Sequence, residues 1–154
     1  MLQPTEQHAM NTSYDSDVIA WAQEQANLLR SGQFSRLDIE HIAEEIEDVG
    51  KSEQRELASR MAVLLAHLLK WEYQPERRGS SREDTIRTQR ERIERRICKT
   101  PSLKSSLSDA DWQADAWDDA VDDAVKETGI ARKVFPKSCP WSKEQIMSQD
   151  FYPD

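Results

Sequence analysis

The chain has 154 residues, 37% of them hydrophobic and 32% charged, and its formal net charge at pH 7 is -8. A chain of this length supplies one core of ordinary size, and two domains would each have too little apolar content. No apolar run approaches the roughly 18 to 20 residues that span a bilayer, and the first ten residues have neither the basic start nor the apolar centre of a secretion signal. We therefore expect one cytoplasmic domain with no membrane contact.

The first third of the chain predicts two helices after an irregular start. Residues 1–12 have no periodicity, so we expect a flexible N-terminus over 1–12 and a helical domain over 13–154. Gly32 stands where a left-handed cap would end the first helix, and Asp38 can cap the second. The predicted apolar stripes are Val18, Ile19, Ala22, Ala26 and Leu29, widened by Trp21 and Leu28, on the first helix and Ile39, Ile42, Ile46 and Val49 on the second.

The middle of the chain predicts the core. Helical spacing resumes over 52–70, so Gly50 either divides two nearly collinear helices or lies within one long helix. Residues 61–69 are apolar nearly all round, which is typical of a central helix, and Pro75 ends it. A basic helix that starts at Ser80 or Ser81 follows. Its narrow apolar stripe consists of Ile86, Ile93 and Ile97.

The last third predicts a long helix and a short one. A Thr-Pro pair at 100–101 indicates the start of a helix that runs to Gly129, with apolar residues at alternating spacings of four and three. Ser142 and Gln145 fit a capping box for a last short helix. The predicted fold class is therefore all-α: a single-domain antiparallel helical bundle of about five helices with a short C-terminal helix.

Several charged and aromatic segments occur together in a family-specific order. They are Tyr14-Asp15, residues 28–32 (LLRSG), 44–53 (EEIEDVGKSE), 67–78 (HLLKWEYQPERR), 85–90 (TIRTQR), 139–141 (CPW) and 150–153 (DFYP). In this order the chain resembles domain-of-unknown-function family 29 over almost its whole length. The resemblance implies a bacterial protein with an all-helical fold. Because the activity of that family is not established, the resemblance implies no reaction, cofactor or catalytic residue.

From the residues, we expect a non-enzymatic protein that binds an unknown protein partner or forms a homo-oligomer, without a cofactor. Residues 76–99 carry nine basic side chains against five acidic ones, whereas residues 109–127 carry eight acidic side chains and one lysine. Either these segments are neighbouring helices with complementary charge, or one of them faces a partner. Trp112 lies off the apolar seam, so it is either exposed at a contact or packed under the loop 139–141.

A first alternative is nucleic-acid binding through the basic helix over 77–96. Aromatic rings can stack on bases while arginines contact phosphates. The interspersed acids and the acidic segment downstream oppose this hypothesis because they weaken the positive field. The candidate residues are Trp71, Tyr73, Arg77, Arg78, Arg87 and Arg90.

A second alternative is a metal-dependent enzyme that uses His67 with Glu44 or Glu45. The chain contains neither paired Glu-x-x-His segments nor His-Glu-x-x-His, so the ligands would have to come together from different helices. The competing interpretation is that His67 is a core histidine bonded to a carboxylate, which orients two helices.

Overall fold

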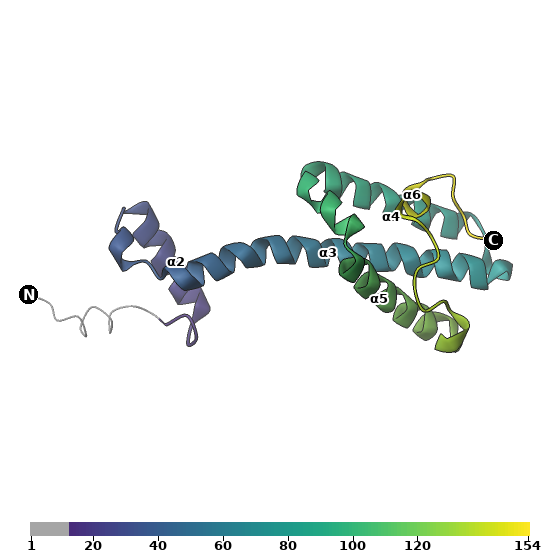
Figure 1. Cartoon of the computed structure of the whole chain (residues 1–154), viewed down its shortest axis with the longest axis horizontal. Coiled ribbons are helices and arrows are strands. Elements are labelled where there is room, and N and C mark those ends of the chain that lie inside the picture. Colours follow the sequence, from purple (N-terminus) through teal and green to yellow (C-terminus); the bar gives the residue numbers. More distant parts are fainter. Residues whose placement is uncertain (1–12) are drawn as a thin grey trace, which may run out of the picture. The chain divides into compact units, whose positions relative to one another are not determined.

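The computed structural model describes residues 13–154, so the flexible N-terminus expected over 1–12 lies outside the described residues (Figure 1). Every regular element between 13 and 154 is helical, which confirms the all-α fold class. Contacts divide the chain into two compact units, with the boundary between Gly50 and Lys51. We call their described parts the N-terminal unit (13–50) and the C-terminal unit (51–154). The single domain expected over 13–154 stays a prediction.

The helices are labelled in Figure 1. The α-helices are α2 (Val18–Arg30), α3 (Ile39–Tyr73), α4 (Ser80–Lys99), α5 (Ala110–Thr128) and α6 (Lys143–Met147), and the 3-10 helices are η1 (Phe34–Arg36), η2 (Pro75–Arg77), η3 (Pro101–Ser108) and η4 (Arg132–Val134). Within residues 13–154, none of these helices combines the length and apolar content needed to cross a membrane.

α2 begins and ends where the sequence predicts, but only Trp21 and Leu28 of its predicted stripe are buried. The Asp17 side chain accepts a hydrogen bond from the backbone N–H of Ala20 at 3.0 Å, and Gly32 has a φ of +74°, which permits the left-handed turn after the helix. The residues of α2 that are buried are Trp21, Gln25 and Leu28, whereas Val18, Ile19 and Leu29 are exposed. The expectation that the latter three pack in a core was wrong.

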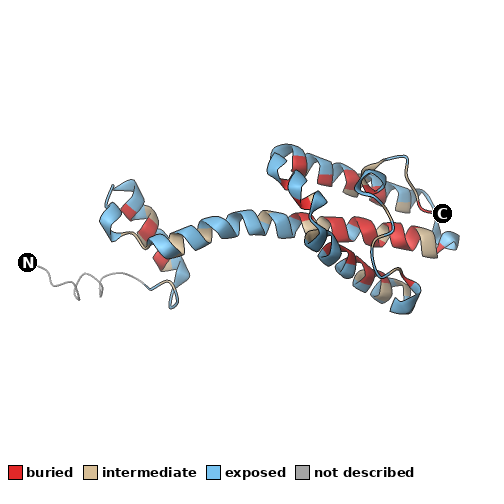
Figure 2. Cartoon of the chain, viewed as in Figure 1, coloured by how far each residue is buried: buried red, intermediate tan, exposed pale blue. Residues whose placement is uncertain are grey.

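α3 is one continuous helix that passes through Gly50. The long-helix alternative is therefore correct. Only its C-terminal part is heavily buried: nine apolar side chains from Leu57 to Trp71 belong to the core of the C-terminal unit, as predicted for the central helix. Figure 2 shows this change from exposed to buried residues along α3.

The predicted long helix after residue 100 was placed nine residues too early. Residues 101–108 form the 3-10 helix η3, and α5 begins only at Ala110. Serines at four of these eight positions disfavour an α-helix, because their hydroxyls compete for backbone groups. Asp109 then supplies the N-cap, and its carboxylate accepts from the backbone N–H groups of Asp111 and Trp112 at 2.9 and 3.0 Å.

The C-terminal segment closes the core of the C-terminal unit. The capping box of Ser142 and Gln145 is present and starts α6, which confirms that prediction. Ile146 and Phe135 are buried in this core. The indole N–H of Trp117 donates to the carbonyl of Pro136 at 3.0 Å, so α5 also fixes the loop that leads to α6.

Candidate functional site

The N-terminal unit carries most of the exposed large apolar side chains of residues 13–154. Seven of the nine such residues belong to it, and we call these seven the apolar face. They are Val18, Ile19, Leu29, Phe34, Ile39, Ile46 and Val49, each between 47% and 71% exposed. Scattered single apolar residues are normal on a protein surface, but a concentration of this kind in 38 described residues is typical of an interaction site.

A polar cluster holds α2 against the start of α3. Asp38 is its centre: its carboxylate accepts from the indole N–H of Trp21 at 3.0 Å and contacts Nδ1 of His41 at 2.7 Å, while its backbone N–H donates to the Gln25 side chain at 2.8 Å. The Tyr14 ring stacks on His41 with 4.1 Å between ring centroids. The interior of the N-terminal unit is thus closed largely by polar and aromatic contacts, and most of its aliphatic side chains remain outside.

Hydrogen bonds in this cluster shift several pKa values. The Tyr14 hydroxyl donates to the Glu45 carboxylate, and this bond, with burial and the negative charge of Glu45, raises the pKa of Tyr14 to about 12. Burial opposes ionisation of Asp38, but hydrogen bonds from His41 and Trp21 outweigh it and lower the pKa of Asp38. The bond to Asp38 raises the pKa of His41. The cluster therefore favours a protonated His41 paired with an ionised Asp38.

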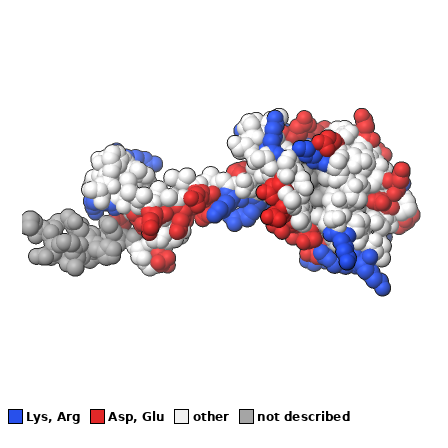
Figure 3. Space-filling model, in the orientation of Figure 1, with Lys and Arg blue, Asp and Glu red and all other residues white. Residues whose placement is uncertain are grey.

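The first three turns of α3 separate apolar from charged residues. Ile39, Ile46 and Val49 lie on one side of the helix with the small residues Ala43 and Gly50, all of them exposed. The acidic side chains lie at other positions around the axis, and Figure 3 shows acidic atoms along one side of this helix and uncharged atoms along the other. The exposed acids are Glu40, Glu44, Glu47 and Asp48, and the fifth acid of these turns, Glu45, is half-buried and accepts from Tyr14. The apolar side is therefore framed by a polar rim, as interaction surfaces commonly are.

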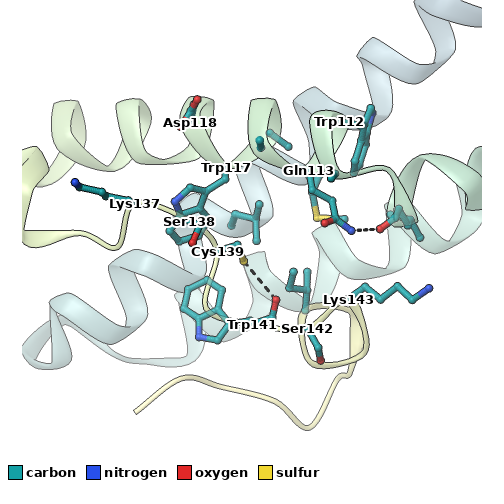
Figure 4. A pocket seen from close by; sticks show the side chains of 17 residues that line it. Trp112, Gln113, Trp117, Asp118, Lys137, Ser138, Cys139, Trp141, Ser142 and Lys143 are labelled. Carbon is teal, nitrogen blue, oxygen red and sulfur yellow. Dashed lines mark hydrogen bonds between the residues drawn. The ribbon is translucent and has the colours of Figure 1, made fainter.

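A cavity of about 350 Å³ lies in the C-terminal unit among three indole rings (Figure 4). Trp112, Trp117 and Trp141 line it together with Met61 and Cys139. The Cys139 thiol donates to the carbonyl of Trp141 at 3.5 Å, and burial raises its pKa, so the thiolate is disfavoured. The lining suits a small apolar group. No local sequence pattern predicts this cavity, since its walls come from three segments far apart in the chain.

Trp112 lines this cavity and also an open hollow beside α3. Its ring is half-buried, and its indole N–H donates to the carbonyl of Gln54 at 3.0 Å. Cys139 and Trp141 line the same cavity. Trp112 thus packs against the core of the C-terminal unit and shares a cavity with the loop 139–141, while part of it remains exposed.

The basic candidates do not form one surface. Arg90 is only 1% exposed, and its guanidinium donates to the carbonyls of Ile146 and Phe151, both at 2.7 Å. Arg87 is exposed and pairs with Asp84 on its own helix at 2.9 Å. Arg77 is also exposed. Arg90 is thus a core residue that no phosphate can reach in the folded protein.

The two aromatic candidates next to these arginines are also part of the packing. Trp71 is buried and tilts against Tyr152, with 4.8 Å between ring centroids. Arg78 lies 5.5 Å from the Trp71 ring centroid and donates from Nε to the Trp71 carbonyl at 2.7 Å. Tyr73 packs edge-on against Phe135 at 4.9 Å, and burial raises its pKa. Neither ring is free to stack on a base.

The charge-complementary pairing of the basic and acidic segments is also absent from the ion pairs described for residues 13–154. Arg96 of α4 pairs with Glu53 of α3 at 3.1 Å. In α5, Asp118 and Asp122 pair with Arg132 of η4. Glu127 accepts from Lys70 of α3. The ion pairs described for α4 and α5 therefore join residues within one helix or to other elements, and none of them joins α4 to α5.

The residues of the metal hypothesis are not brought together. His67 follows Glu45 by 22 residues on the same continuous helix, about six turns away, so the two do not face each other from different helices as that hypothesis requires. Glu45 accepts the Tyr14 hydroxyl bond instead. Among residues 13–154, no group of three or more His, Cys, Asp or Glu side chains is arranged to hold a metal ion.

His67 is half-buried, but it does not bond a carboxylate, so that interpretation was also wrong. Its Nδ1 atom is buried without a hydrogen-bond partner, and the carboxylate of Glu127 is engaged by Lys70. Burial, together with the positive charge of Lys70, lowers the pKa of His67 to about 4. His67 is therefore neutral at pH 7.

The comparison with known families decides the classification. A family model described as "Domain of unknown function DUF29" matches residues 13–152. The chain belongs to the DUF29 family. The DUF29 match covers both the N-terminal unit and the C-terminal unit, which confirms the resemblance predicted from the sequence. No curated protein and no solved structure matches the chain.

Proposed function

We propose that this DUF29 protein functions by binding protein, and that the apolar face of the N-terminal unit is the binding surface. The observation that carries the proposal is the concentration of seven exposed large apolar residues between Val18 and Val49. Exposed apolar surface in water is unfavourable by roughly 25 cal/mol for each Å². A partner that covers this face removes that cost.

The size of the N-terminal unit supports the same proposal. The unit spans residues 1–50, and small units bury a smaller share of their surface than large ones do, so the smallest need disulfides, metals or association to be stable. Both cysteines of the chain, Cys98 and Cys139, lie in the C-terminal unit and are free. The N-terminal unit does carry an exposed apolar face, so association with another protein is the means of stabilisation that its surface supports.

The C-terminal unit supports a scaffold role. Its core includes residues from α3, α4, α5 and α6, and only Val63 and Val134 are large exposed apolar side chains there. Because its core is well covered, the C-terminal unit can carry the N-terminal unit without itself aggregating. We also propose a bacterial, cytoplasmic setting. Two free cysteines are the usual state in a reducing compartment.

Site-specific photocrosslinking in living cells tests the proposal. A benzophenone amino acid replaces Ile46 in the apolar face and, as the control, the exposed Glu91 of α4. We expect irradiation to produce a discrete protein adduct from position 46 and none from position 91. An adduct at neither position, or equal labelling at both, would overturn the assignment of the apolar face.

A further inference from the structure

We propose that the partner of the apolar face is a second copy of this chain, and that the N-terminal part of α3 lies at the centre of the contact. This inference rests on the proposed function, because it requires the apolar face to bind protein. It names the occupant, which the proposed function leaves open. The residue spacing on α3, the exposed area and the distribution of charge all favour a second copy.

The spacing along α3 is that of a helix-pairing seam. Ile39, Ile42, Ile46 and Val49 follow one another at intervals of three, four and three residues. This is the spacing of the a and d positions of a heptad, at which side chains of one helix fit between those of another. All four residues are β-branched, so each loses little side-chain freedom when it packs. The seam covers two heptads and is exposed apart from the half-buried Ile42.

The residues beside the seam allow close approach. Ala43 and Gly50 occupy the same flanking position in successive heptads, and both are small and exposed. With no long side chain there, a second helix can lie close to the seam. Glu45, on the other flank, has its carboxylate engaged by the Tyr14 hydroxyl, so it is turned toward its own unit.

The charges of α3 are placed where a self-contact tolerates them. Glu40, Glu44, Glu47 and Asp48 occupy the b, f, b and c positions relative to the seam, on the outer side of a pair. Two identical acidic helices would repel each other if these residues lay at the contact. A basic partner would instead be expected to meet acidic residues placed at the centre of the surface.

The exposed area agrees with a two-copy interface. Multiplied by ordinary residue areas, the exposed fractions of the seven side chains amount to on the order of 700 Å² for each chain. A contact that covered all seven side chains on both copies would bury roughly 1,400 Å², which falls within the range of stable standard interfaces. Such a contact uses the same patch twice and closes after two chains.

Sedimentation velocity on the full chain tests this inference. Wild type, Ile46→Glu and Val49→Glu are compared with Val63→Glu at roughly 1 to 100 µM chain, where contacts of this area are populated. Val63 is the matched control: it is a valine on the same helix, 37% exposed against 66% for Val49, and it lies outside the apolar face. Glutamate favours helix, so the variants keep α3. Circular dichroism checks that they do.

We expect wild type and Val63→Glu to sediment at twice the chain mass. For Ile46→Glu and Val49→Glu, we expect the dissociation constant of the dimer to be at least tenfold higher than that of the wild type. Added salt is expected to leave the dimer intact or strengthen it, because salt screens repulsion between two negative chains. A wild-type protein that stays at the single-chain mass would overturn the inference. So would dissociation of Val63→Glu to the same extent as Val49→Glu.

The photocrosslinking result separates this inference from the proposed function. If the purified chain is a monomer but position 46 labels a different protein in cells, the second copy is excluded and protein binding stands. If the chain is a monomer and position 46 labels nothing, both fail. An adduct of twice the chain mass in cells, together with a dimer in solution, supports both.

Discussion

Arg90 keeps its charge inside the C-terminal unit because main-chain carbonyls surround it. The carbonyls of Ile146 and Phe151 each accept at 2.7 Å, and the guanidinium carbon lies 5.5 Å from the Tyr152 ring centroid. Its Nη1 atom is buried without a partner. A buried guanidinium is costly unless its donors are used, so these contacts determine whether the residue stabilises the fold.

Replacement of Arg90 by Met is expected to lower the free energy of unfolding by about 2 kcal/mol, because two carbonyls lose a charged donor. Hydrogen exchange of residues 143–152 should become faster. Arg87→Met, on the exposed side of the same helix, should change stability by less than about 0.5 kcal/mol. Urea unfolding measures both. Equal effects of the two substitutions would show that the buried contacts contribute little.

His67 makes the stability of the C-terminal unit depend on pH. Its pKa is about 4 in the folded protein, against an ordinary value of 6.5 in an unfolded chain. Between these values the unfolded chain binds more protons than the folded one, so stability falls as the pH drops from 6.5 toward 4. The cause is burial of the ring beside the positive Lys70.

Between pH 7 and pH 5, the free energy of unfolding of the wild type is expected to fall by about 2 kcal/mol because of His67. The His67→Gln variant should not show this part of the fall. Urea unfolding at the two pH values, followed by circular dichroism, measures the difference. His41→Gln is the contrasting variant. Asp38 raises the pKa of His41, so protonation of His41 stabilises the fold at low pH, and its removal should steepen the loss. A His67→Gln protein with the wild-type pH dependence would contradict the assignment.

At the scale of elements, α3 contains one glycine in a regular helix and α5 ends at another in a left-handed turn. Gly50 lies within α3 with no atom within 4 Å of the position that a Cβ would take. Gly129 follows α5 with a φ of +73°, which side chains rarely adopt. The same substitution should therefore have opposite effects at the two positions.

Gly50→Ala is expected to raise the free energy of unfolding by roughly 0.5 to 1 kcal/mol, because alanine loses less freedom in a helix than glycine does. Gly129→Ala should lower it by about 1 kcal/mol through strain at positive φ. Thermal melts followed at the helix band of circular dichroism check both. Destabilisation by Gly50→Ala would mean that α3 is not regular at that position.

Periodicity predicted the helices well because each carries its own signals. The capping box at Ser142 and the apolar run from Met61 to Leu69 are local features, and both were interpreted correctly. The start of α5 was misplaced because a Thr-Pro pair marks the start of a 3-10 helix equally well. The stripe of α2 was predicted as core, since periodicity shows that a face is apolar but not whether anything covers it.

At the scale of the whole molecule, the two units differ in how much they bury. In the N-terminal unit the buried side chains are Trp21, Gln25 and Leu28, whereas the C-terminal unit has an extensive apolar cluster. Regions with few buried contacts open at lower free energy than the core does. The sequence could not predict this division, because the aliphatic residues of both units look alike until their neighbours in space are known.

Hydrogen exchange should therefore protect the backbone amides of residues 57–71 more strongly than those of α2. We expect α2 to exchange faster by tenfold or more, because each 1.4 kcal/mol of opening free energy changes the rate tenfold. Mass-spectrometric exchange on the full chain measures both segments in one experiment. Equal protection would show that the contacts around Asp38 stabilise α2 as well as the apolar core stabilises α3.

The candidate site could be predicted only in part. The sequence showed the apolar stripes at Ile39 and Val49 and suggested protein binding, but it placed those residues inside a bundle. It assigned Arg90 to a surface because arginine is seldom buried. The carbonyls that hold Arg90 belong to Ile146 and Phe151, at least 56 residues later in the chain, and no local pattern shows such a contact.

The hydrogen bonds from Arg90 to the carbonyls of Ile146 and Phe151 also impose an order on folding during synthesis. A ribosome makes the chain from its N-terminus, so α3 and α4 emerge before residues 146 to 151 exist. Until then the guanidinium has neither of its carbonyl acceptors, and burying it against α3 would be unfavourable. Translation must therefore pass residue 151 before the C-terminal unit can complete its core.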